Sequence, residues 1–279
     1  MRVAPPQSQF DADTAVWEDG DGGPGGRWGA VLSDRWSIGG RPNGGYLLAT
    51  VARAMARQAG REHPMSVTAH YLQPTAEGPA TVVTELIRQG RNQSTVTASL
   101  YQDGAERVRA IGAFATLDRL EGPSREWPPP PDLPPLDDCP DLLSLAPPGG
   151  MAGPPEILHR FEVRIDPRVG WPRGERAGMD TIGAWIRFAD GWPVDVASLP
   201  LFADALPPAI FDLMPTGWVP TVSLTVMVRA VPVPGWLRIV FRTRTVVNGT
   251  IEEDGEVWDD AGRLVCLSRQ LAVVLPPAS

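Results

Sequence analysis

The sequence predicts an α+β fold made of two similar halves, each an antiparallel sheet wrapped around one buried helix. A proline-rich segment divides the 279 residues near the middle and leaves two halves of similar size. Each half shows the same order of elements, namely a strand, an apolar helix-like segment and a series of strand-like runs. Identical residues also recur between the halves at a constant separation, as expected for an internal duplication.

Residues 120–160 form the predicted linker. They contain clusters such as EWPPPPDLPP and show neither a helical nor a strand period. Proline fixes φ and removes a backbone donor, so this composition is typical of a surface connection or strap. We therefore expect an N-terminal domain at residues 1–119 and a C-terminal domain at residues 161–279.

The N-terminal half begins its regular structure with a strand at residues 27–36, RWGAVLSDRW. An apolar, alanine-rich segment follows, and four runs rich in β-branched residues come after it without another helix. The turn sequences PTAEG, QGRN and QDGAE separate these runs, as expected for antiparallel strands. The four predicted strands are residues 66–73, 79–88, 93–102 and 108–117.

The apolar helix begins with two glycines, in the sequence NGGYLLATVARAM at residues 43–55. It is apolar nearly all round, which is typical of a helix buried on most sides. Asn43 suits the N-cap, because its side chain can accept a hydrogen bond from a first-turn N–H. Glycine costs a helix interior about 1 kcal/mol relative to alanine, so Gly44 and Gly45 need a reason. Either a ligand approaches the N–H groups at the positive helix end, or this end packs tightly against a strand.

The C-terminal half repeats this order. Residues 181–188 are a predicted strand, and the apolar segment LPLFADALPPAIFDL at residues 199–213 is expected to be helical around its Pro-Pro pair. Six pairs of identical residues, among them Thr68 and Thr225, are separated by 157 positions. A sheet around one buried helix is the hotdog arrangement, so the duplication predicts a double hotdog. The remaining predicted strands are residues 222–230, 235–247, 251–260 and 263–275.

The composition excludes several classes of protein. A net charge of −8 argues against nucleic-acid binding, which needs a basic face. No apolar run approaches the roughly 18 residues of a membrane span, and the N-terminus lacks the apolar core of a signal peptide. Two cysteines, Cys139 and Cys266, give no disulfide framework. We therefore expect a soluble, cytoplasmic protein.

Missing residue types exclude several kinds of active site. The chain has no lysine, which rules out a Walker A loop, a Schiff-base lysine and an S-x-x-K nucleophile. No G-x-S-x-G sequence is present, so the nucleophile elbow of the α/β-hydrolases is also ruled out. Three scattered histidines and two cysteines do not form a zinc site.

The ordered motifs resemble the TesB-like acyl-CoA thioesterases of the double-hotdog superfamily. The N-terminal half contributes NGGYLLATVARAM, HYLQPTAEG and LIRQGRNQSTVTASLYQDG, and the C-terminal half contributes LPLFADALPPAI, VPTVSLTV and RLVCLSRQLAVV. The resemblance implies hydrolysis of an acyl-CoA thioester to the free acid and CoA, without a metal or organic cofactor. It also implies that an Asp, a Thr and a Gln hold and activate a water. The matching positions here are Asp204, Thr221 and Gln270.

The chemistry of these three residues is consistent with that implication. Asp204 lies within the apolar sequence LFADAL, where desolvation would raise the pKa of a carboxyl group towards that of a useful base. Thr221 and Gln270 taken alone are ordinary strand residues. A buried Gln must find hydrogen-bond partners, and a water shared with Asp204 and Thr221 would supply them.

Further residues are candidates for substrate binding. Asn43, Gly44 and Gly45 at the helix start suit an oxyanion or carbonyl site, although the sequence does not decide which half supplies that helix. His70 either points into the pocket or is a satisfied core histidine. Arg91, with Arg88, either meets the CoA phosphates or is a solvated surface residue.

Two other functions stay open. A hydratase or dehydratase of acyl thioesters would need a catalytic histidine, for which His70 is the one candidate, and the expected spacing to an aspartate is missing. A non-catalytic binder of acyl thioesters would keep Asp204, Thr221 and Gln270 for structure alone. The expected partner is an acyl-CoA substrate, with an acyl-carrier protein as the alternative carrier. Hotdog sheets usually pair, so a homo-oligomer is also expected.

Overall fold

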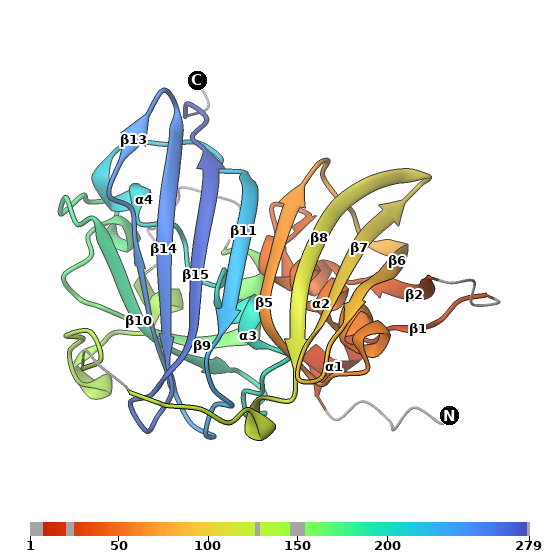
Figure 1. Cartoon of the computed structure of the whole chain (residues 1–279). Coiled ribbons are helices and arrows are strands. Elements are labelled where there is room, and N and C mark those ends of the chain that lie inside the picture. Colours follow the sequence, from red (N-terminus) through yellow and green to blue (C-terminus); the bar gives the residue numbers. More distant parts are fainter. Residues whose placement is uncertain (1–7, 21–24, 126–128, 146–153, 278–279) are drawn as a thin grey trace.

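One antiparallel sheet runs through both halves of the chain in the computed structural model (Figure 1). The structure describes residues 8–20, 25–125, 129–145 and 154–277. The extreme N-terminus, which was expected to lack a signal peptide, and parts of the predicted linker therefore lie outside the described residues. The strands of the N-terminal half follow the order β1 (Trp17–Glu18), β2 (Gly26–Leu32), β6 (Gly78–Gln89), β7 (Ser94–Gln102), β8 (Ala105–Ala115) and β5 (His63–Tyr71).

The sheet continues from β5 directly into the C-terminal half. The next strands are β11 (Thr221–Val228), β15 (Leu264–Val273), β14 (Thr250–Trp258), β12 (Leu237–Arg242), β10 (Thr181–Phe188) and β9 (Phe161–Ile165), with β13 (Val246–Val247) beside β14. The long strands coincide with the predicted ones to within a few residues at each end. The short strands β1, β9 and β13 were not predicted separately, because two to five residues give too little alternation to detect.

The pairing of β5 with β11 reveals the internal symmetry. Thr68 lies opposite Thr225 in this ladder, and their Oγ1 atoms are 2.9 Å apart. These two residues are also separated by the 157 positions that relate the two halves of the sequence. The local two-fold axis of the duplication therefore passes between them, and the two hotdog sheets join at this axis.

Helix α2 (Gly44–Ala59) is the buried helix of the N-terminal half, on the far side of the sheet in Figure 1. Its side chains at Tyr46, Leu48, Val51 and Met55 are fully buried. The helix ends at Gly60, whose φ of 60° lies in the left-handed region that favours glycine. The sequence-based prediction of a buried apolar helix is therefore correct for this half.

The corresponding segment of the C-terminal half is not one helix. It contains two single turns, α3 (Leu199–Phe202) and α4 (Ile210–Leu213), with residues 203–209 non-helical between them. Pro207 and Pro208 lie in this interval, and proline cannot donate the backbone hydrogen bonds of a helix interior. The interruption leaves Asp204 on a connecting segment rather than on a helix face.

Aromatic side chains hold the two halves together behind the sheet. Phe188 packs on Phe161 at 5.9 Å and on Phe202 at 4.8 Å between ring centroids, and Trp36 meets Phe161 and Phe10 in edge contacts. Because these rings come from both halves, α3 is fixed against the start of α2.

The other elements here are α1 (Gln9–Asp13), the hairpin of β3 (Ser37–Ile38) and β4 (Arg41–Pro42), and the 3-10 turns η1 (Asp34–Trp36) and η5 (Glu156–Arg160).

Residues 130–134 of the predicted linker lie along the outer face of the C-terminal sheet, at the front in Figure 1. Trp185 Nε1 donates to the carbonyl of Pro134 at 3.0 Å, and Arg238 donates to the carbonyl of Pro131 at 3.2 Å. The segment is thus a strap that is bonded to the sheet. Its short turns, with those on either side, are η2 (Leu117–Arg119), η3 (Leu136–Asp138), η4 (Leu142–Leu145) and η6 (Trp171–Arg173).

Candidate active site

Asp204 meets the N-terminus of α2, although the two lie in different halves of the chain. Its Oδ2 atom accepts hydrogen bonds from the backbone N–H of Gly45 at 2.8 Å and from Asn43 Nδ2 at 2.9 Å. Asn43 has a second function, because its Oδ1 accepts from Tyr46 N–H at 3.0 Å and so caps the helix as predicted. The carboxylate is therefore fixed at the positive end of the helix dipole, where a negative charge is stabilised.

The two glycines allow this close approach. A Cβ atom on Gly45 would lie 2.6 Å from the carbonyl oxygen of Pro200 and 2.8 Å from Cβ of Asp204. A Cβ atom on Gly44 would lie 3.0 Å from Asp204 Oδ2 and 3.1 Å from Cζ of Tyr71. Of the two explanations left open by the sequence, tight packing therefore applies to Gly45, but the partner is α3 and the segment that carries Asp204, not the expected strand. The N–H of Gly45 is already bonded to Asp204, so the expectation that it meets an oxyanion does not hold.

Thr221 and Gln270 form a second hydrogen-bonded unit on the inner face of the sheet. Gln270 Nε2 donates to Thr221 Oγ1 at 2.8 Å, from β15 to the start of β11. The register of these strands shifts between Thr221 and Ser223, which is a β-bulge of the kind that redirects a side chain. Gln270 is 8% exposed, so the bond to Thr221 satisfies an amide that is nearly out of solvent.

One cavity brings these two units together. Its volume is about 170 Å³, and its wall includes Asn43, Gly44, Asp204, Thr221 and Gln270. The remaining wall is largely apolar, which suits an acyl group better than a charged ligand. The main apolar residues of the wall are Ile38, Leu158, Leu206, Phe211, Trp218 and Val219.

Burial changes the acid–base properties of this cavity. Desolvation raises the pKa of Asp204 to about 6, although the hydrogen bonds from Gly45 and Asn43 act in the opposite direction. At neutral pH the group is mostly ionised, yet it is a stronger base than an ordinary aspartate. Tyr71, which donates to the Gly44 carbonyl at 2.7 Å, has a pKa far above its usual value because of burial and the charge of Asp204. It therefore stays a neutral phenol.

Glu253 is a member of the cavity wall that the sequence analysis missed. It belongs to β14, is 5% exposed, and lies opposite Gln270 in the β14–β15 ladder. Burial, as the main cause, raises the pKa of Glu253 to about 8. The sequence did contain a signal: Glu253 has the same strand parity as Ile251 and Val257, so an alternating strand places its carboxyl on the apolar face.

Two of the predicted substrate-binding residues lie elsewhere. His70 is exposed on the face of β5 opposite to Val67 and Ala69, which point into the core, so it is neither in the cavity nor a core histidine. Arg91 is exposed in the turn between β6 and β7, where its carbonyl accepts a hydrogen bond from Arg61. Arg88, the weaker candidate, is exposed near the end of β6. None of the three belongs to the wall of the cavity that holds Asp204.

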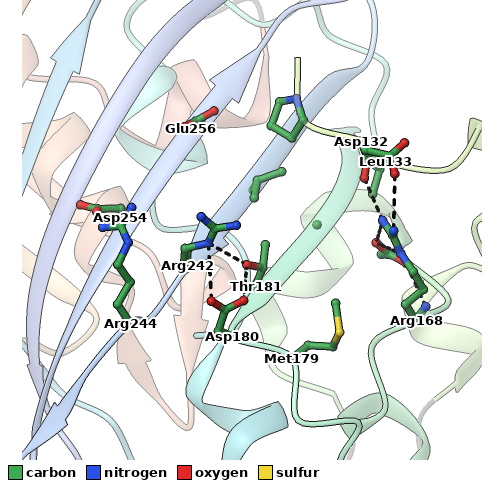
Figure 2. A pocket seen from close by; sticks show the side chains of 14 residues that line it. Asp132, Leu133, Arg168, Met179, Asp180, Thr181, Arg242, Arg244, Asp254 and Glu256 are labelled. Carbon is green, nitrogen blue, oxygen red and sulfur yellow. Dashed lines mark hydrogen bonds and ion pairs between the residues drawn. The ribbon is translucent and has the colours of Figure 1, made fainter. Parts of the chain in front are cut away.

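A larger cavity of about 410 Å³ lies on the outer face of the C-terminal sheet, under the strap. Figure 2 shows its arginines directed towards carboxylates. Arg168 pairs with Asp166 at 2.7 Å, Arg242 pairs with Asp180 at 3.8 Å, and Arg244 pairs with Asp254. Since these charges neutralise one another, this cavity lacks the unpaired buried group that marks the cavity of Asp204.

Within the described residues, no three His, Cys, Asp or Glu side chains are grouped closely enough to hold a metal ion. No helix in the same part of the chain has the length and apolar character needed to cross a bilayer.

Comparison with known families identifies the family to which the chain belongs. The model of an acyl-CoA thioesterase N-terminal domain matches residues 32–115, and the model of an acyl-CoA thioesterase C-terminal domain matches residues 130–274. The chain belongs to this acyl-CoA thioesterase family. The predicted resemblance to TesB-like thioesterases is thereby confirmed. Membership of this family supports the conclusion that the protein is an enzyme that hydrolyses thioesters.

Solved structures agree with this assignment. A Thermobifida fusca protein classed as a thioesterase II has 31% identity and a TM-score of 0.84, over 96% of this chain and 98% of its own. A hot dog fold protein from Alicyclobacillus acidocaldarius has 23% identity and a TM-score of 0.82, over 98% and 100%. The acyl-CoA thioesterase II TesB2 of Mycobacterium marinum has 17% identity and a TM-score of 0.71, over 96% and 99%. The last two similarities show the fold alone, and the predicted double hotdog is confirmed.

Proposed function

We propose that this thioesterase hydrolyses acyl-CoA to a free acid and CoA, with Asp204, Thr221 and Gln270 as its catalytic residues. The observation that carries the proposal is their convergence on one narrow apolar cavity at the start of α2. A thioester carbonyl in this cavity needs an activated water and a donor for the developing oxyanion. The side chains and amides around Asp204 can supply both.

Asp204 is the proposed base. Both hydrogen bonds that it receives from described residues end on Oδ2, which leaves Oδ1 to accept a proton from a water. Thr221 accepts a hydrogen bond from Gln270, so its own hydroxyl proton is free to be donated to that water. The amide oxygen of Gln270 can accept the second proton of the same water. The three side chains thus orient one nucleophile.

Gly44 is the proposed oxyanion donor. In the first turn of α2, the N–H of Gly45 bonds Asp204 and the N–H of Tyr46 bonds the Asn43 side chain. No described residue accepts a hydrogen bond from the N–H of Gly44, and Gly44 lines the cavity. An amide at a helix N-terminus carries the partial positive charge that stabilises an oxyanion.

The alternative of a hydratase or dehydratase has lost its candidate residue. That function depended on His70, whose side chain lies on the outer face of β5, away from the cavity. A non-catalytic binder is distinguished by experiment, because it would bind acyl-CoA without releasing a thiol.

The test is free-thiol release from acyl-CoAs between acetyl and palmitoyl, measured for the wild type and Asp204→Asn. Loss of a general base lowers the rate by roughly 10²–10⁴-fold, and we expect a loss in this range. Asp190→Asn, the same substitution in an exposed turn, is the matched control and should keep the wild-type rate. An Asp204→Asn enzyme with the wild-type rate would refute the proposed base, and wild-type binding without release would indicate a binder.

A further inference from the structure

Glu253 shares the cavity of the proposed catalytic residues without belonging to their motifs. Its position on β14 places it directly across from Gln270, with both side chains on the inner face of the sheet. It is 5% exposed, and it lines the same cavity as Asp204 and Thr221. A carboxyl group in such surroundings costs folding free energy, so its presence calls for a chemical reason.

One oxygen of this carboxyl group is anchored and the other is not. Oε2 accepts hydrogen bonds from the backbone N–H of Ala209 at 2.7 Å and from Thr243 Oγ1 at 3.3 Å. Within the described residues Oε1 has no hydrogen-bond partner, and no arginine forms an ion pair with the group. The carboxyl is therefore held in place through one oxygen, while the other can carry a proton into the cavity.

The charged groups around Glu253 favour its neutral form. Asp204, on the segment between α3 and α4, lines the same cavity, and its charge opposes a second negative charge on Glu253. Both oxygens of Asp212, on α4, accept hydrogen bonds from backbone N–H groups. Arg41 lines the cavity but is exposed, and Arg242 and Arg269 on the neighbouring strands are exposed and pair with other carboxylates. No buried cation compensates a charge on Glu253 in the described structure.

We propose that Glu253 is the catalytic acid of this site and protonates the sulfur of the leaving thiol. The inference rests on the proposed hydrolysis of acyl-CoA and assigns a second proton-transfer group to it. Two carboxyl groups in one cavity with different environments are a common way to separate base from acid. Asp204, bonded to two donors, serves as the base, and the poorly solvated Glu253 holds the proton.

The proton and electron balance of the reaction closes with these two groups. As the water oxygen bonds the thioester carbon, one water proton moves to Asp204 and the carbonyl electrons move to oxygen. When the tetrahedral intermediate collapses, the C–S bond breaks and its electron pair stays with sulfur. The proton of Glu253 transfers to that sulfur, so the products are a carboxylic acid and a neutral thiol.

The pair then returns to its starting state. Burial raises the pKa of Asp204 to about 6 and the pKa of Glu253 to about 8. Glu253 therefore holds a proton more strongly than Asp204, so transfer of the proton from Asp204 to Glu253 is favourable. An acid with a pKa near 8 also matches an alkyl thiol, whose pKa is about 8.5, as efficient proton transfer requires.

The test compares leaving groups. Wild type and Glu253→Gln are assayed with two esters of one acid: the N-acetylcysteamine thioester, whose alkyl thiol needs protonation, and the S-phenyl thioester, whose aryl thiolate leaves unaided. We expect Glu253→Gln to lose roughly 10²-fold in kcat with the alkyl thioester and less than about tenfold with the aryl one. Glu252→Gln, the adjacent substitution on the outer face of β14, is the matched control and should change neither rate.

Each outcome decides between the alternatives. Equal losses on both thioesters would show that Glu253 only supports the fold, and would overturn its assignment as the acid. The pH profile of the wild type is a second test that needs no variant. Activity should rise through about pH 6 as Asp204 ionises and fall through about pH 8 as Glu253 ionises. A rate that stays constant to pH 10 would also overturn the assignment of Glu253 as the acid. A wild-type enzyme inactive on every thioester would instead refute the proposed hydrolysis, and the role of Glu253 with it.

Discussion

Replacing Gly45 with alanine tests whether packing or helix propensity governs the start of α2. Propensity alone predicts stabilisation by at most about 1 kcal/mol, because alanine is the better helix former. The structure predicts the opposite sign, since the new Cβ would overlap the backbone carbonyl of Pro200 at 2.6 Å and Asp204 Cβ at 2.8 Å. Such overpacking costs about 1–3 kcal/mol, and weakening the hydrogen bond to the Asp204 carboxylate adds about 1.5–3. After the propensity gain of up to about 1 kcal/mol is subtracted, we expect a net destabilisation of about 1.5–5 kcal/mol.

Urea unfolding of the wild type and Gly45→Ala measures this difference, and free-thiol release measures its effect on the site. Gly44→Ala is the graded comparison, because its nearest contacts, at 3.0–3.2 Å, are side-chain atoms of Asp204 and Tyr71 that can shift. It should lose less stability than Gly45→Ala. A Gly45→Ala protein that is more stable than the wild type would refute the argument from close packing.

Three further predictions concern buried groups. Asp212→Ala should lose about 3 kcal/mol or more in urea unfolding, because it leaves three backbone N–H groups without their carboxylate acceptor. Thr221→Val should lower kcat by about 10–100-fold in thiol release, since it removes the partner of Gln270 and the hydroxyl donor to water. For Glu253 the folded pKa is raised from 4.5 to about 8, so protonation favours the folded state. That contribution is complete below pH 4.5 and disappears as pH rises to about 8, at a cost of about 5 kcal/mol. Glu253→Gln should remove this loss, as unfolding at pH 5 and pH 8.5 can check.

The sequence predicted the features that depend on composition and spacing. The separation of 157 positions between Thr68 and Thr225 anticipated a duplication, and the two residues lie face to face on its local axis. The cap at Asn43 follows from local chemistry and was also predicted correctly. Strand ends were predicted to within a few residues because turn residues separate the runs.

Which face a side chain occupies was harder to predict. His70 was a candidate because it was the one histidine within a predicted strand, yet its parity in β5 places it on the outer face. Glu253 was overlooked although residues 251–260 were predicted as a strand, since only its alternation with Ile251 and Val257 shows that its side chain points inward. The reason for Gly45 depended on a contact with Asp204 across 159 positions, which no local pattern contains.

A duplicated chain could carry two active sites, one for each half. The residues at the equivalent positions indicate a single active site per chain. At the repeat separation, Asp204 corresponds to Leu47, and Glu253 corresponds to Val96, both buried and apolar. Gln270 pairs with Glu253 across the strands as Gly112 pairs with Val96, so the amide has no counterpart either.

The helix start is equally unsymmetric. The positions that correspond to Gly44 and Gly45 are Leu201 and Phe202, whose buried side chains fill the space that the glycines leave open. One half therefore supplies the helix N-terminus and the other supplies the carboxylates, and the reverse arrangement is lost. Calorimetric titration with an unreactive acyl-CoA thioether should give one bound molecule per chain, and Asp204→Asn should not change that number. Two equivalent binding sites per chain would contradict the conclusion that the two halves contribute different parts of a single site.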